Sequence, residues 1–100
     1  MIQMEAMARG IIEHAIDDEL TDRKLELSYK TFKKFEDIGV IKSAKSAMFG
    51  KIYSEVFSYF VNYKMHSEEP IKLDEMEEFE NIIERRIFEI HSRILLLSAK

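Results

Sequence analysis

Apolar residues recur at steps of three and four along most of the chain, which is the period of an amphipathic helix. The first stretch, residues 2–20, places these residues on one face: Met4, Met7, Ala8, Ile11, Ile12, Ala15 and Ile16. A second helix is expected over residues 22–38, with Thr21 as a suitable N-cap. Its apolar side carries Leu25, Tyr29, Phe32 and Phe35. No Gly or Pro separates the two stretches, so one bent helix is the alternative.

A stop signal and a start signal separate the second predicted helix from the third. Gly39 suits the left-handed C′ position of a Schellman motif, in which Val40 would fold back on Phe35. Ser43 is the expected N-cap of a third helix over residues 44–65.

The last predicted helix spans residues 74–98, after a loop that contains Pro70. Asp74 is the expected N-cap, and Glu77 three residues later completes a capping box. The apolar positions repeat every seven residues and form a coiled-coil-like seam of Met76, Ile83, Ile90 and Leu97, with Ile87 and Ile94 beside them. The whole pattern predicts an all-α fold, a single-domain antiparallel helical bundle of three to four helices over residues 1–100.

The composition agrees with a helical domain and excludes several classes of protein. The chain is 46% apolar and 34% charged, with three glycines and one proline, unlike a disordered or turn-rich β chain. It has no cysteine, which excludes disulfides and thiolate zinc sites. No apolar run approaches the roughly 20 residues of a membrane span, and the N-terminus lacks the pattern of a secretion signal. We therefore expect a cytoplasmic location.

The helix expected over residues 44–65 has an apolar sector too wide for a single neighbour. Six aromatic residues contribute to it: Phe49, Tyr53, Phe57, Tyr59, Phe60 and Tyr63. Aromatic side chains dominate the centres of protein interfaces, so we expect part of this stripe, or the outer apolar positions of residues 74–98, to lie in an interface. Gly50 is less stable than Ala in a helix interior by about 1 kcal/mol, so we expect another backbone to approach it closely.

A polar cluster on the first predicted helix suggests a metal site. His14 and Asp18 are four residues apart and share a helical face. Two such residues supply half of the three or four protein ligands that a divalent metal usually needs, and the chain offers no second helical pair. The alternative is a solvated polar face opposite the apolar stripe.

Arg86 and His91 form a second candidate site. An Arg and a His with four residues between them are similar to the Arg-x4–6-His motif of HEPN ribonucleases, which are α-helical bundles. The resemblance implies that Arg86 binds a phosphate and that His91 assists proton transfer at the attacked 2′-hydroxyl and its leaving group. The two residues are about 140° apart on an ideal helix, and the alternative makes Arg86 a partner of nearby acids such as Glu89.

The net charge of −4 conceals a basic middle between acidic ends. Lysines crowd the segment that joins the second and third predicted helices: Lys30, Lys33, Lys34, Lys42, Lys45 and Lys51. The segment resembles a helix-turn-helix with Gly39 at the turn, which implies contacts from these lysines to phosphates. No Arg, Asn or Gln, the usual readers of bases, lies between Lys24 and Glu55. The alternative is a helical hairpin with a solvated lysine face.

The sequence contains no nucleophile–base pair, Gly-rich phosphate loop, complete metal set or cofactor fingerprint. The leading prediction is therefore a non-enzymatic helical protein without a cofactor, which acts through protein contacts in a regulatory or adaptor role and forms a homodimer. A nucleic-acid-binding regulator and a HEPN-like ribonuclease are the second and third hypotheses.

Overall fold

A computed structural model describes residues 6–98, which are helical apart from short connections and contain no strand. The helices are α1 (Ala6–Glu19), α2 (Asp22–Asp37), α3 (Ala44–His66), α4 (Leu73–Arg85) and α5 (Ile87–Ser98). The all-α prediction is confirmed, but three to four helices were expected and five are present in the described residues. Residues 2–5 of the first predicted helix lie outside the described range.

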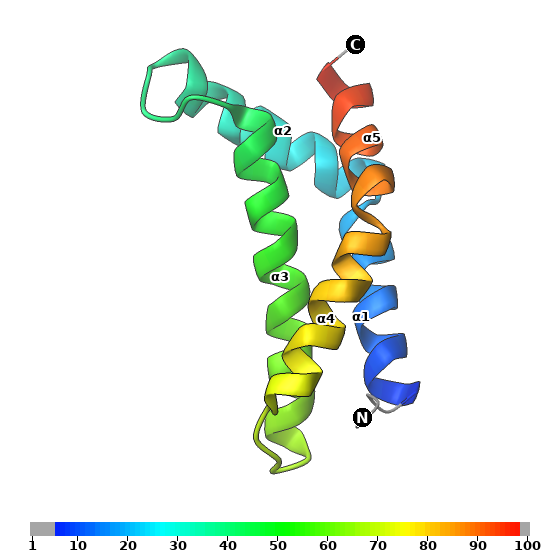
Figure 1. Cartoon of the computed structure of the whole chain (residues 1–100). Helices are drawn as coiled ribbons and strands as arrows, with labels where there is room; N and C mark the ends of the chain where they lie inside the picture. Colours follow the sequence, from blue (N-terminus) through cyan, green and yellow to red (C-terminus); the bar gives the residue numbers. More distant parts are fainter. Residues whose placement is uncertain (1–5, 99–100) are drawn as a thin grey trace.

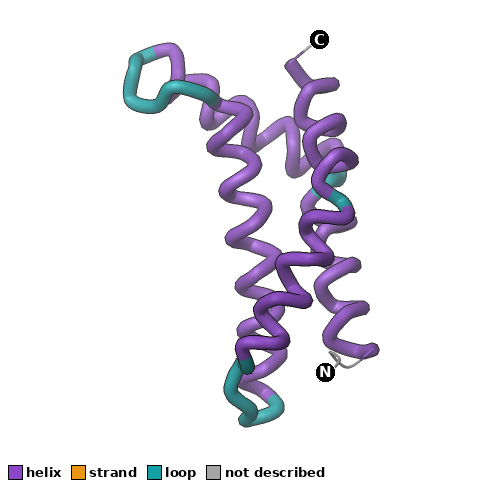
Figure 2. The backbone as a smooth tube through the Cα atoms, viewed as in Figure 1, coloured by secondary structure: helices purple, strands orange, loops and turns teal. Residues whose placement is uncertain are grey.

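Three long units lie side by side, and α2 crosses one end of them (Figure 1). α3 runs antiparallel both to α1 and to the successive helices α4 and α5. The α2–α3 turn and the α3–α4 loop lie at opposite ends of the molecule (Figure 2). The molecule is elongated, with extents of 44 × 23 × 21 Å. None of the described helices is both long and apolar enough to cross a membrane.

The core follows the predicted apolar stripes of α1, α3, α4 and α5. Its largest fully buried side chains are Phe60, Phe79, Ile12, Ile16, Met48, Ile82, Ile90 and Val56. The ring of Phe79 stacks on Phe60 with 5.8 Å between the ring centroids, so the centre of α4 is fixed against α3. Only Leu25 is fully buried on α2, in agreement with its position across the end of the bundle.

The signals between α2 and α3 act as predicted. Gly39 has a φ of +83°, and Val40 N–H donates to the Phe35 carbonyl at 2.9 Å, as in a Schellman motif. Ser43 precedes α3, and its hydroxyl accepts a hydrogen bond from Ser46 N–H at 3.1 Å.

Thr21 precedes α2 as expected, although its side chain makes no capping hydrogen bond. The first two helices are therefore separate.

The structure corrects the expected start of the last helix. α4 begins at Leu73, one residue before the predicted cap Asp74, and Lys72 is the N-cap. The carboxylate that accepts the backbone N–H of Lys72, at 3.0 Å, belongs to Glu75 and not to Glu77. Glu75 can turn inward because Lys64 lies beside it at 2.8 Å, a contact that the local sequence does not reveal.

Two further expectations fail. Gly50 is exposed, and a side-chain carbon at that position would meet nothing within 4 Å among the described residues, so no backbone approaches it there. The helix predicted over residues 74–98 is interrupted at Arg86, whose φ of −102° and ψ of 6° end α4 before α5 begins. At this break Arg86 makes a set of contacts with α1, described below.

Candidate functional site

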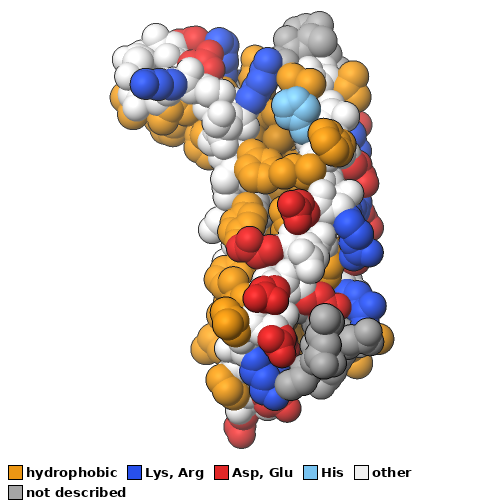
Figure 3. Space-filling model, viewed as in Figure 1, with side chains coloured by type: hydrophobic (Ala, Val, Ile, Leu, Met, Phe, Trp, Pro, Cys, Tyr) orange, Lys and Arg blue, Asp and Glu red, His pale blue; other side chains and the backbone are white. Residues whose placement is uncertain are grey.

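An apolar groove of about 620 Å³ lies between the N-terminal half of α3 and α5. It is lined by Lys45, Ser46 and Phe49 from α3 and by Ile87, Phe88, His91, Ile94 and Leu95 from α5. The space-filling view shows apolar side chains beside lysine and histidine toward this end of one face (Figure 3). Grooves of this size and lining are typical binding sites.

The groove exists because α5 is apolar on two sides. Ile90, Ile94 and Leu97 face the core and are buried. Phe88 and Leu95 lie outside this buried row, and 80% and 41% of their surfaces are exposed. A helix that is apolar around most of its circumference is normally covered on more than one side, so part of α5 lacks a neighbour within the described chain.

The polar side chains that line the groove are those of Lys45, Ser46 and His91. The Lys45 ammonium can only donate hydrogen bonds, whereas the Ser46 hydroxyl and the His91 ring can donate or accept. Neither the Lys45 nor the His91 side chain makes a hydrogen bond or an ion pair with any of residues 6–98. The charge of Lys45 is a minor cause of the lowered pKa of Glu36, which falls below its usual value mainly through a hydrogen bond from Lys33. The groove is therefore apolar with a basic rim.

The predicted aromatic stripe of α3 does not form one surface. Phe60 is fully buried, and Tyr53 and Phe57 pack edge-on against Phe79 with ring centroids 5.5 and 5.3 Å apart. Tyr63 is also partly buried against the core. These four members of the stripe mainly hold the subunit together.

The other two aromatic residues face different sides of the molecule. Phe49 lines the groove beside α5. Tyr59 is 43% exposed and lines a second hollow, together with Met7 and Ile11 of α1. Phe49 is thus the residue of the predicted stripe that reaches the α3–α5 groove. Phe88 and Leu95, which complete the groove, belong to the outer apolar positions of residues 74–98 that were the alternative prediction. Their signal was the apolar positions in residues 87–97 beyond those needed for the seam.

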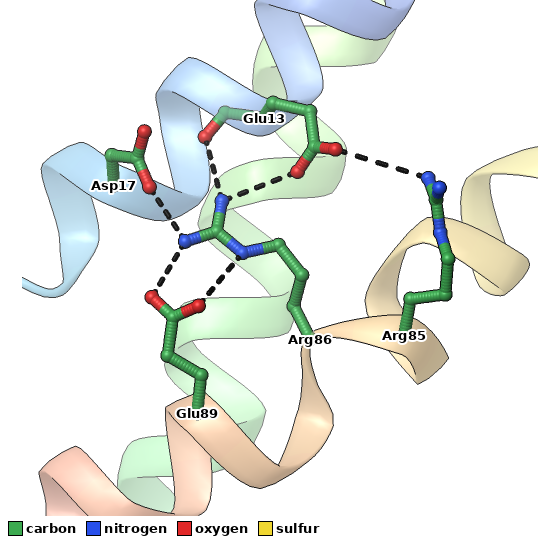
Figure 4. Close-up of polar contacts among 5 residues, drawn as sticks. All are labelled: Glu13, Asp17, Arg85, Arg86 and Glu89. Carbon is green, nitrogen blue, oxygen red and sulfur yellow. Dashed lines mark hydrogen bonds and ion pairs between the residues drawn. The ribbon is translucent and has the colours of Figure 1, made fainter.

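Arg86 joins three acids from two other helical segments at the α4–α5 break (Figure 4). Its Nη2 lies 2.6 Å from carboxylate oxygens of both Asp17 and Glu89, and its Nη1 lies 3.2 Å from Glu13 Oε1. Nη1 also donates to the Glu13 carbonyl at 3.2 Å. The hydrogen bond to Glu89 does most to raise the pKa of Arg86 above its usual value. Arg85 lies 3.8 Å from the other oxygen of Glu13 and completes the network.

His91 is not among the groups that Arg86 contacts. It lines the α3–α5 groove with Lys45, while the Arg86 guanidinium is directed toward α1 (Figure 4). All three guanidinium nitrogens donate to oxygens of Glu13, Asp17 or Glu89, so a phosphate would have to displace them. The ribonuclease hypothesis therefore requires Arg86 to break the hydrogen bonds that it makes with these three acids.

His14 and Asp18 share one surface, as predicted, and line the hollow beside Tyr59. Lys24 Nζ lies 2.8 Å from the Asp18 carboxylate, and this hydrogen bond lowers the pKa of Asp18. No group of three or more His, Cys, Asp or Glu side chains suited to a metal occurs within residues 6–98. The predicted half-site gains no further ligand in the described structure.

The six lysines of the basic middle fall into two sets. Lys33 donates to Glu36 at 2.6 Å and lies 3.3 Å from Asp37, and the Glu36 bond does most to raise its pKa to about 12. Lys51 lies 3.7 Å from the buried Glu19. The other four are exposed and have no ion pair within the described chain: Lys30, Lys34, Lys42 and Lys45.

Comparison with known proteins gives no family assignment. The chain matches no protein family, no curated protein and no solved structure. The similarities to HEPN ribonucleases and to helix-turn-helix proteins therefore rest on short stretches of sequence alone. The geometry of the surface is the remaining basis for a functional assignment.

Proposed function

We propose that this protein acts through protein contacts rather than catalysis, and that it forms a homodimer through the groove between α3 and α5. The observation that carries the proposal is the second apolar side of α5, where Phe88 and Leu95 line a groove of about 620 Å³. Large apolar side chains gathered around a hollow are typical of the centres of interfaces. A regulatory or adaptor role follows from a surface of this kind without a catalytic constellation.

The mass of the protein in solution tests the proposal. The parent chain should scatter light as a dimer at micromolar concentrations, and Phe88→Glu should shift it to a monomer because a charge would be placed in an apolar contact. Met65→Glu is the matched control, since Met65 is 68% exposed but lies at the far end of α3. This control should remain dimeric. Phe60→Glu is unsuitable, because Phe60 is fully buried and its replacement would unfold the subunit.

The same experiment addresses the nucleic-acid alternative, which the four unpaired lysines support. A random DNA duplex or mixed RNA should leave the mass of the dimer unchanged. A complex that forms and then dissolves as salt is raised would favour the alternative, because phosphate contacts release counterions. A parent chain that is monomeric at several hundred micromolar would contradict the homodimer.

A further inference from the structure

One side of α4 and α5 carries a band of residues, most of them three or four positions apart. The band consists of Glu77, Glu80, Asn81, Glu84, Phe88, His91 and Leu95. Its α4 half is acidic and borders a shallow hollow, and its α5 half forms a wall of the apolar groove. Tyr53 of α3 donates a hydrogen bond to Glu80 at 2.9 Å, while Phe49, one turn earlier, lines the groove. The two halves therefore belong to one continuous face (Figure 3).

The charged side chains at the two ends of this face form no hydrogen bond or ion pair within residues 6–98. These side chains are Glu77 and Glu84 at one end and Lys45 at the other, and the charge of Lys45 acts on Glu36 only as a minor cause of its lowered pKa. Lys45 lines the groove together with His91 of α5, whereas Glu77 and Glu84 border the hollow on α4. Opposite charges are thus separated along the face within one chain.

We propose, on the basis of the homodimer above, that the second copy docks on this face about a twofold axis that passes close to Phe88. Rotation about this axis reverses the band, so Lys45 of each chain lies beside Glu84 of the partner subunit. The rotation also brings the exposed Phe88 rings of the two chains together over the grooves. A twofold interface needs a self-complementary surface, and a face that is basic at one end and acidic at the other satisfies this requirement.

The distribution of side chains on the face suits an interface. Its centre is apolar and the charges lie around it, as in known interfaces.

A charge exchange between two chains tests this arrangement. Lys45→Glu and Glu84→Lys should each weaken the dimer by roughly tenfold or more, because each creates two like-charge contacts per dimer. An equimolar mixture of the two variants should recover the dimer, since every contact in the heterodimer joins opposite charges again. With one of the two variants labelled with ¹⁵N, native mass spectrometry separates the heterodimer from both homodimers by mass.

Lys30→Glu and Glu55→Lys are the matched controls, because both residues are exposed, lie away from this face and change the net charge by the same amounts. Each control should stay dimeric, and their mixture should show no preference for the heterodimer. Circular dichroism confirms that all four variants are folded.

Recovery of the dimer in the Lys45→Glu and Glu84→Lys mixture supports the twofold arrangement. A dimeric parent whose two variants remain dimeric, or whose mixture stays monomeric, overturns this arrangement and leaves the protein-contact function intact. A monomeric parent at all concentrations overturns the homodimer and the arrangement together.

Discussion

At the scale of single residues, Glu68 is the one residue other than glycine with a positive φ in the described chain. It has a φ of +57°, in the left-handed region, and its N–H and that of Glu69 close a Schellman motif at the end of α3. The Glu68 side chain makes no hydrogen bond or ion pair within the described chain. Glu68→Gly should therefore raise the free energy of unfolding by about 0.5–1 kcal/mol, since the strain exceeds the entropy cost of Gly.

Urea denaturation measures this gain, with Gly39→Ala as its counterpart. Gly39 occupies the equivalent position at the end of α2, so a side chain there should lower the free energy of unfolding by a similar amount. Equal stability of the parent and Glu68→Gly would refute the argument from strain. Gly39 could be recognised from the sequence because glycine marks the left-handed position, whereas Glu68 gives no such signal.

At the scale of helices, the side chain of Arg86 ties the break between α4 and α5 to α1. Its side chain is only 17% exposed and binds Glu13, Asp17 and Glu89. Arg86→Gln would leave three carboxylates together without that cation, so the free energy of unfolding should fall by about 2 kcal/mol. Arg93→Gln is the control, because Arg93 makes one exposed ion pair with Asp22 and should cost less than about 0.5 kcal/mol. A similar decrease in the free energy of unfolding in the two variants would show that the Arg86 network does not stabilise the break between α4 and α5.

The same residue explains why the helices were predicted better than the break between two of them. Ile83, Ile90 and Leu97 are buried as their spacing predicts, because burial of an apolar stripe follows from local period. The break contains neither Gly nor Pro, and the acids of α1 that Arg86 binds there, Glu13 and Asp17, lie about 70 residues away in the sequence. A contact so distant in sequence cannot be read from local pattern.

At the scale of the whole molecule, the candidate surface combines residues from three helices. The wide stripe of α3 predicted an interface, but the structure places most of it against α4 and leaves Phe49 at the groove. The exposed side of α5 depends on the direction in which α5 leaves the Arg86 break. The sequence could therefore predict that the protein has an apolar contact surface, while the location of that surface required the packed structure.

The first three joints between successive helices share one electrostatic feature, which is a carboxylate with a lowered pKa. At the α1–α2 joint, Lys24 lowers the pKa of Asp18 by a hydrogen bond. At the α2–α3 joint, Glu36 has a lowered pKa because it accepts hydrogen bonds from Lys33 and from the N–H of Ala44, at the start of α3. Protonation of either carboxylate weakens a connection between helices.

The α3–α4 joint contains the most buried example. Burial raises the pKa of Glu75, but the hydrogen bonds from Lys64 Nζ and the Lys72 N–H, together with the lysine charges, outweigh burial and leave it below its usual value. The Glu75 and Lys64 side chains are only 9% and 7% exposed, so each depends on the other. Glu75→Gln should lower the free energy of unfolding at neutral pH by about 2 kcal/mol, as expected for loss of a charged hydrogen bond.

These lowered pKa values predict that acid destabilises the whole molecule. A carboxyl group whose pKa is lower in the folded state than in the unfolded state contributes its full stability above the unfolded pKa, near 4.5 for Glu75. That contribution is lost as the pH falls through this value toward the folded pKa. Urea denaturation between about pH 6 and pH 3 should show a steady decrease in the free energy of unfolding, with a shallower slope in Glu75→Gln. Identical slopes in the parent and the variant would mean that Glu75 binds its proton equally well in the folded and unfolded chains, and that the Lys64 contact does not hold the joint.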